Sequence, residues 1–256
     1  MLAKLWTRLD TAERRFRRSW GRDISTPAAR RWAQLHYHVF DHAFLRMFWT
    51  NFWPVAPGVW RSNQPTAARF ARYKAMGIKT VVNLRGEDTY AHYLFEKEAC
   101  EALGLTLVDA KLWARTAAPR KRIVAVIDAL RAAEKPMVFH CKSGADRAGF
   151  VAAMYQMVFE GVPVAEARKQ LGLKYIHLEF TKTGVQGYIL DTYAARQTHS
   201  DISFEDWIRS EYTSRTIQQG YDARRPPAAT ARVLMDAAAS AAQVEDAADP
   251  RQRDRT

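Results

Sequence analysis

Cysteine and long hydrophobic runs are both scarce in this chain of 256 residues. Its two cysteines, Cys100 and Cys141, are too few for a disulfide-built secreted domain or a four-cysteine zinc site, which favours a reducing compartment. No window reaches the ~18 uncharged apolar residues that cross a bilayer. Basic residues such as Lys4 and Arg8 interrupt any secretory hydrophobic region within residues 1–30. We therefore expect a soluble, cytoplasmic protein.

Acidic residues are few relative to basic ones. The chain has 27 Asp and Glu against 39 Lys and Arg, which gives a formal net charge of +12 at pH 7. This excess favours anionic partners, such as phosphorylated substrates or an anionic membrane surface. The sequence shows no interleaving of aromatic and basic residues in a recognised nucleic-acid module, so we do not expect nucleic acid as a partner.

The apolar residues are concentrated in one part of the chain, which predicts one domain with two extensions. Residues 53–221 hold the core-forming segments, and residues 1–52 have the character of a helical N-terminal extension. Residues 222–256 are rich in Ala, Arg and Asp and predict a poorly ordered tail.

Residues 1–20 place apolar side chains near helical spacing between many arginines. The favoured interpretation is a helix that packs on the main domain with its basic face in solvent. The alternative is a helix that makes peripheral contact with an anionic membrane. The apolar positions are Leu2, Leu5, Trp6, Leu9, Phe16 and Trp20.

Short apolar segments alternate with segments of helical pattern between residues 55 and 160. The β-branched run at 78–84 is typical of a buried strand, and the run at 119–133 is typical of an amphipathic helix. This alternation predicts an α/β fold, with a central, mainly parallel sheet flanked by helices. The other predicted strands are 55–62, 105–110 and 136–140, and the other predicted helices are 66–76, 89–103, 147–160, 163–171 and 204–212.

The segment at residues 139–149, FHCKSGADRAG, lies where a buried strand meets the start of a helix. A loop at such a junction directs several backbone N–H groups toward one point, and the helix dipole adds positive potential there. A phosphate dianion is a natural ligand for this arrangement. The same field lowers the pKa of a cysteine at the start of the loop, which makes Cys141 a candidate nucleophile.

Two further residues of this loop suit phosphate chemistry. Arg147, six residues after Cys141, has a planar guanidinium that can hold two phosphate oxygens. Gly144 permits a tight turn and close approach of the backbone to a ligand. Nucleophile, anion cradle and transition-state clamp are thus supplied by one short loop.

This Cys-x5-Arg loop with His140 in front resembles the signature loop of the protein tyrosine phosphatase superfamily, in particular its dual-specificity branch. The stretch at 58–85 is also similar to the opening of small atypical dual-specificity phosphatases. The resemblance covers roughly residues 55–195. It implies that Cys141 attacks phosphorus to give a cysteinyl-phosphate, which water then hydrolyses without a metal or other cofactor.

The resemblance also assigns the remaining residues of the loop. The main-chain N–H groups of the loop, from Lys142 to Arg147, are expected to hold the phosphate oxygens, while His140 orients the loop and supports the thiolate. Lys142 is in addition a candidate contact for a further phosphate. The expected substrate-binding residues are His140, Lys142, Ser143, Gly144 and Ala145.

Two residues are candidates for the general acid. The family usually supplies an Asp from a separate loop, and Asp109 stands 32 residues before Cys141. Some relatives with a similar loop use the Asp beside the Arg, which is Asp146 here. We favour Asp146, because Asp109 falls within or at the end of a predicted strand and the loop that follows it contains no acid.

One residue departs from the family pattern. Ala148 stands where a Ser or Thr hydroxyl normally contacts the cysteine sulfur, which is expected to slow breakdown of the phosphoenzyme. The favoured function is a cysteine-dependent phosphatase, with protein phosphotyrosine as the default substrate. The alternatives are an inositol phosphate or phosphoinositide phosphatase, a phosphate-binding pseudophosphatase and a rhodanese-like sulfurtransferase.

Overall fold

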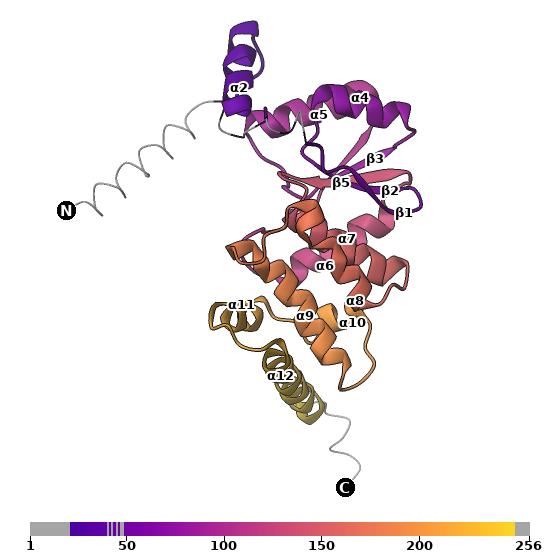
Figure 1. Ribbon diagram of the computed structural model, residues 1–256, viewed down its shortest axis with the longest axis vertical. Helices are drawn as coiled ribbons and strands as arrows, with labels where there is room; N and C mark the ends of the chain where they lie inside the picture. The colour runs from indigo at the N-terminus through magenta and orange to yellow at the C-terminus, as the bar shows by residue number, and fades with distance from the viewer. Residues whose placement is uncertain (1–20, 40, 42, 45, 47–48, 249–256) are drawn as a thin grey trace, which may run out of the picture.

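The computed structural model describes residues 21–39, 41, 43–44, 46 and 49–248 (Figure 1). The predicted amphipathic helix of residues 1–20, with its alternative membrane contact, lies outside these described residues. Among the described helices, none combines the length and hydropathy needed to cross a bilayer.

A five-stranded sheet forms the centre of the fold, with the strand order β1-β2-β5-β3-β4. Strands β2, β5, β3 and β4 run parallel to one another, and β1 runs antiparallel beside β2. The prediction of a mainly parallel sheet is confirmed. The strands are β1 (Trp53–Ala56), β2 (Val59–Asn63), β3 (Thr80–Asn83), β4 (Thr106–Asp109) and β5 (Met137–Cys141).

Helices cover both faces of this sheet (Figure 1). On one face α4 and α5 enclose a small core that includes Phe70, Val81 and Val138. On the other face α6, α7 and α9 enclose a larger core that includes Phe139 and Val151. The helices are α2 (Pro27–Val39), α4 (Ala67–Ala75), α5 (Ala91–Leu103), α6 (Arg120–Ala132), α7 (Asp146–Phe159), α8 (Val164–Ala167), α9 (Val185–Gln197), α10 (Phe204–Ser210), α11 (Ser214–Asp222) and α12 (Pro227–Ala248).

Two predictions about individual elements are wrong. The segment 55–62 is not one strand but a hairpin, because Gly58 has a φ of +73° and turns the chain between β1 and β2. The tail predicted at 222–256 is not poorly ordered over 227–248, where α12 packs on α9. Alanine side chains let α12 approach closely, Leu234 is buried, and the hydroxyl groups of Tyr188 and Thr230 lie 2.7 Å apart.

Side-chain alternation along β5 determines what lies on each side of the candidate site. His140 faces α5, where its partner Glu96 lies, whereas Cys141 belongs to the core on the α7 face. Asn83 and Asp109 are aligned with His140 across the parallel neighbours β3 and β4, so they share its face of the sheet. The two faces therefore bring different groups to the same loop.

Candidate active site

The loop after β5 lies at the carboxyl end of the central strand, where open α/β sheets place their ligand sites. Cys141 is the last residue of β5, and α7 begins five residues later at Asp146. The first turn of α7 therefore directs its free N–H groups and its dipole at the loop, as the sequence predicts.

Gly144 is required by the conformation of this loop. Its φ is +73°, and an added Cβ would lie 2.7 Å from the backbone N of Asn63 and 2.8 Å from the carbonyl carbon of Ser62. The absence of a side chain lets the loop pack directly against the end of β2. In this position the Gly144 N–H donates a hydrogen bond to Cys141 Sγ at 3.2 Å, which is a contact that stabilises a thiolate.

Arg147 lies close to the same sulfur. Burial lowers the pKa of its guanidinium, while the nearby Cys141 sulfur and the Asp146 carboxylate oppose that shift. One guanidinium nitrogen donates to the Leu84 carbonyl at 3.4 Å, and the buried Nε has no hydrogen-bond partner among the described residues. The guanidinium thus retains donors for an anion beside Cys141.

The side chain of Arg61 supports the loop, a role that the sequence does not predict. This fully buried side chain donates to the carbonyls of Gly144 at 2.7 Å and Ala145 at 3.2 Å. It also donates to Gln170 and lies over the Tyr175 ring at 4.0 Å. Burial lowers its pKa to about 10. These bonds fix two carbonyls of the loop against the side chain of Arg61.

Buried side chains hydrogen-bond to one another on the α5 side of the loop. His140 Nε2 lies 2.5 Å from Glu96 Oε1, and Gln64 Nε2 donates to the other Glu96 oxygen at 2.7 Å. The Gln64 backbone N–H reaches the Lys142 carbonyl at 3.3 Å. These bonds are compatible with the predicted orienting role of His140. They also bring Glu96 and Gln64 to the site, which the sequence does not indicate because both residues are far from the loop along the chain.

A residue of the N-terminal extension also reaches this side. Asp41 contacts Arg85 at 2.9 Å, Arg46 at 2.6 Å and Lys142 at 3.3 Å. Burial acts to raise the pKa of Asp41, but these cations, Arg85 foremost, outweigh it and hold the pKa well below its usual range. Burial lowers the pKa of Lys142, whose side chain is 40% exposed. Lys142 therefore stands at the rim of the loop, tied to the extension.

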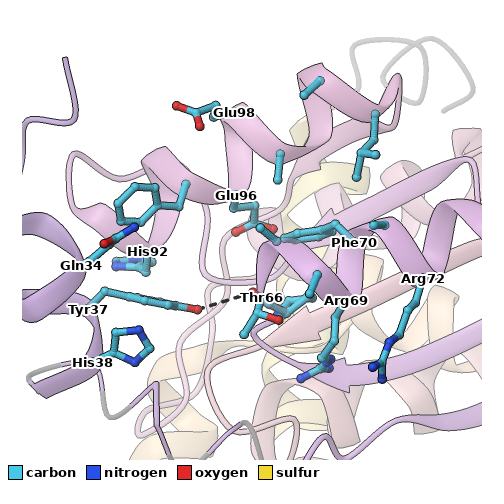
Figure 2. A pocket seen from close by; sticks show the side chains of 18 of the residues that line it. Gln34, Tyr37, His38, Thr66, Arg69, Phe70, Arg72, His92, Glu96 and Glu98 are labelled. Carbon is cyan, nitrogen blue, oxygen red and sulfur yellow. Dashed lines mark hydrogen bonds between the residues drawn. The ribbon is translucent and has the colours of Figure 1, made fainter. Parts of the chain in front are cut away.

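A pocket of about 730 Å³ lies behind this network, between α2, α4 and α5. Figure 2 shows His92 and Glu96 of α5, Tyr37 of α2 and Arg69 of α4 among the side chains that line the pocket. Within the described part of the chain, its lining includes no residue of the loop 141–147. The pocket is thus distinct from the candidate catalytic loop, although Glu96 borders both.

The two general-acid candidates have different hydrogen-bond partners. Asp109, at the end of β4, accepts hydrogen bonds from Asn83 at 2.8 Å and from the Tyr93 hydroxyl at 2.7 Å. Burial, with the bond to Asp109 next in size, raises the pKa of Tyr93 above its usual range. Both Asp109 oxygens are therefore used on the α5 face, two strands away from the strand that ends in Cys141.

Asp146, in contrast, begins α7 within the loop itself. Its Oδ1 lies 2.8 Å from His177 Nδ1, and its side chain is 19% exposed. His177 is buried, which the sequence does not indicate. Asp146 thus lies in the loop that holds Cys141, whereas Asp109 lies at the end of β4.

Ser143 and Ala148 make no hydrogen bond to the Cys141 sulfur among the described residues. The Ser143 hydroxyl accepts from the Ala145 N–H at 3.3 Å, and the Ser143 carbonyl accepts from Asn51 at 3.2 Å. Ala148 is fully buried in the core. The hydrogen bond to Cys141 Sγ thus comes from the Gly144 backbone, and Ser143 makes a different bond from the one that Ala148 lacks.

A family model described as "DSP-PTPase phosphatase fused to NAD+ Kinase" matches residues 55–183, which is half of the chain. The chain belongs to this family of DSP-PTPase phosphatases. The matched residues include all five strands except the first residues of β1, and the whole loop from Cys141 to Arg147. The resemblance to atypical dual-specificity phosphatases is therefore confirmed.

Among curated proteins, the chain is similar to the dual specificity protein phosphatase TpbA of Pseudomonas aeruginosa, with 33% identity over 116 residues. That match covers 43% of this chain and 48% of the relative, so the chain spans about half the relative's length. The crystal structure of P. aeruginosa TpbA has 22% identity and a TM-score of 0.46, and covers 54% of this chain and 83% of that chain.

The core catalytic domain of the PP-IP phosphatase SIW14 from S. cerevisiae has 14% identity and a TM-score of 0.46. It covers 60% of this chain and 96% of that chain.

Proposed function

We propose that the chain hydrolyses phosphomonoesters through a cysteinyl-phosphate on Cys141. The observation that carries the proposal is the position of Cys141 Sγ, which accepts the Gly144 N–H at 3.2 Å beside the Arg147 guanidinium and the N-terminus of α7. Membership of the DSP-PTPase family and the sequence similarity to TpbA support it.

The proposed reaction has two steps. The Cys141 thiolate attacks phosphorus, the bond from phosphorus to the leaving oxygen breaks, and Asp146 gives that oxygen its proton. Water then attacks the phosphorus, its proton passes to Asp146, and the bond from phosphorus to sulfur breaks to release inorganic phosphate. Arg147 and the loop N–H groups hold the three equatorial oxygens throughout.

Phosphotyrosine in proteins is the proposed substrate, because the curated relative is named a dual specificity protein phosphatase. An inositol phosphate or phosphoinositide is the second candidate. The observation that favours it is the set of three cations, Arg46, Arg85 and Lys142, around the single carboxylate of Asp41, which leaves positive charge at the rim of the loop.

Residues 53–221 are the proposed catalytic domain, and Asp41 gives the extension of residues 1–52 a contact with its site. The cytoplasmic location stays a prediction from the sequence. The alternative of a binding protein without turnover rests on Ala148, since no hydroxyl follows Arg147 to help release the phosphate. If that loss controls turnover, Ala148→Ser will shorten the life of the phosphoenzyme.

The test is turnover of para-nitrophenyl phosphate in the presence of EDTA, with Cys141→Ser beside Cys100→Ser as the matched control. Cys100 is the other buried cysteine and lies in the core on the α5 face. We expect Cys141→Ser to abolish turnover and Cys100→Ser to retain it. Equal activity in wild type and Cys141→Ser would refute the cysteine mechanism.

Substrate class is tested with a phosphotyrosyl peptide and an inositol polyphosphate, on wild type and Lys142→Met. If the rim cations hold a second phosphate, Lys142→Met raises KM for the inositol polyphosphate alone. If the peptide is the better substrate and neither KM changes, the phosphotyrosine assignment stands.

A further inference from the structure

His177 is a buried titratable side chain that the proposed reaction does not use directly. It follows the short helix η2 (Leu173–Tyr175), and its backbone N–H bonds to the Gly172 carbonyl at 3.2 Å. The imidazole is buried, and its Nδ1 lies 2.8 Å from Asp146 Oδ1. The buried Nε2 has no hydrogen-bond partner among the described residues, so the ring is held there by its bond to Asp146.

We propose that His177 is a positioning residue for Asp146, which it holds so that one carboxyl oxygen faces the leaving group. This inference rests on the proposed function, in which Asp146 is the general acid.

The hydrogen-bond geometry assigns separate roles to the two carboxyl oxygens. A proton on Nδ1 rather than on the unpartnered Nε2 avoids burying an unsatisfied donor, so Nδ1–H donates to Oδ1. In the protonated acid Oδ1 is then the carbonyl oxygen, and Oδ2 carries the proton that passes to the leaving oxygen. After the transfer, the same Nδ1–H stabilises the carboxylate until water returns a proton to Oδ2.

The backbone before His177 is held in a conformation that this role explains. Ile176 has a φ of +58°, which is unfavourable for a β-branched residue, and its side chain is 51% exposed. Asn51 ties the segment to the loop, because its Nδ2 donates to both the Ser143 and the Tyr175 carbonyls, at 3.2 and 3.0 Å. Surrounding contacts therefore maintain the turn that directs His177 inward.

Other charged groups also act on Asp146 and must be kept constant in the test. Arg61 of β2 and Arg147 of α7 each interact electrostatically with Asp146, and both also interact with Cys141 of β5. Arg61, Arg147 and Cys141 all remain in place when only His177 is changed.

The test compares kcat/KM for phenyl phosphate, a poor leaving group, with kcat/KM for para-nitrophenyl phosphate, a good one. Departure of phenolate depends strongly on protonation by a general acid, whereas departure of para-nitrophenolate depends on it little. This ratio reports formation of the phosphoenzyme even where its breakdown limits kcat. We expect His177→Phe, which keeps a ring without a donor, to lower the phenyl phosphate value by about tenfold to a hundredfold. The para-nitrophenyl phosphate value should change less than about threefold.

His177→Asn is the rescue variant, since its amide nitrogen stands near the position of Nδ1 and can donate to Oδ1. We expect it to recover most of the loss. His177→Gln, whose amide lies farther from the backbone, should recover less. If His177→Phe fails to fold, the comparison of kcat/KM between His177→Asn and His177→Gln decides the proposal.

Asp146→Asn and the double variant Asp146→Asn/His177→Phe complete the test. A positioning role predicts that the double variant is no slower than Asp146→Asn alone. Equal losses on both substrates, or additive losses in the double variant, would overturn the proposal and leave His177 a purely structural residue. Failure of the proposed function itself is distinguishable, because wild type would then show no turnover dependent on Cys141.

Discussion

The two sides of the catalytic loop are built from the same kinds of groups, an acid with a buried histidine, but they differ in exposure. On the α5 side the Glu96 side chain is 1% exposed, and both of its oxygens bond to buried partners, His140 and Gln64. On the other side the Asp146 side chain is 19% exposed, and one oxygen bonds to His177.

We interpret this difference as separating a carboxylate that stabilises the fold, Glu96, from one that takes part in the proposed reaction, Asp146. A carboxylate with both oxygens occupied in the core can fix the strand that carries Cys141, but it has no oxygen to offer a substrate. A carboxylate that is partly exposed and has one oxygen held by a hydrogen bond can transfer a proton from the other. Substitutions on the two sides should therefore fail in different ways, the first in stability and the second in rate.

The largest effect is expected where the two sides meet, at Arg147. Arg147→Lys keeps the positive charge but loses the planar fork, so kcat/KM for para-nitrophenyl phosphate should fall by about 10³-fold. The control is Arg85→Lys, a nearby cation that contacts Asp41 and Gln64. It should cost less than about tenfold. Comparable losses in both variants would mean that positive charge, rather than the fork of Arg147, is what matters.

The next largest effect distinguishes the two aspartates. Asp146→Asn should lower kcat/KM for phenyl phosphate by about 10²-fold, because a general acid is lost. Asp109→Asn should change it less than about threefold, since both Asp109 oxygens are engaged on the α5 face. If Asp109→Asn were the slower enzyme, the assignment of the acid would reverse.

Glu96 tests the structural side. Glu96→Ala removes the partner of His140 Nε2 and of Gln64 Nε2 in the core, and the free energy of unfolding should fall by about 3–5 kcal/mol in urea denaturation. Glu98→Ala, on the same helix, removes an exposed ion pair with Arg30 and should cost about 0–1 kcal/mol. Similar costs for both would show that the buried network does not hold the strand.

Asp41 gives a smaller, pH-dependent effect. Its folded pKa lies below the unfolded value of about 3.9, so its stabilisation is fully present above that pH and is lost as the pH falls toward the folded pKa. Asp41→Asn should therefore lower the free energy of unfolding by about 2 kcal/mol, equally at pH 7 and pH 5. The difference should shrink below about pH 4.

The control for Asp41 is Asp128→Asn, which removes exposed pairs with Arg131 and Arg209. This variant should cost no more than about 1 kcal/mol. A difference between wild type and Asp41→Asn that grew with acidity would contradict the direction of the Asp41 shift.

The fold and the reactive loop could be predicted from sequence because their signals are local. The run at 78–84 and the Cys-x5-Arg spacing each lie within a few residues, and β3 and the loop appear where they are expected. Local signals failed where packing decides the structure. The Ala-rich α12 has few large apolar groups, yet it is ordered by contact with α9, a helix too evenly buried to show a clear period.

The supports of the site could not be predicted, because they join residues far apart in the chain. Glu96 and His140 are separated by 44 residues, and Arg61 and the Gly144 carbonyl by 83. One weak signal was present for Arg61, the single charged residue in the segment 55–62. For Asp41 the local sequence offers only Arg46, five residues away, since its other partners, Arg85 and Lys142, come from distant segments.

The most direct test of the account is to trap the intermediate. Wild-type protein mixed with para-nitrophenyl phosphate and quenched in acid within its first turnover should carry phosphate on the peptide that contains Cys141, located by mass spectrometry. Ala148 should make the trapped fraction large, because breakdown is slow without a hydroxyl beside the sulfur. Turnover with no phosphate on Cys141, or with phosphate on another residue, would contradict the central claim that this cysteine is the nucleophile.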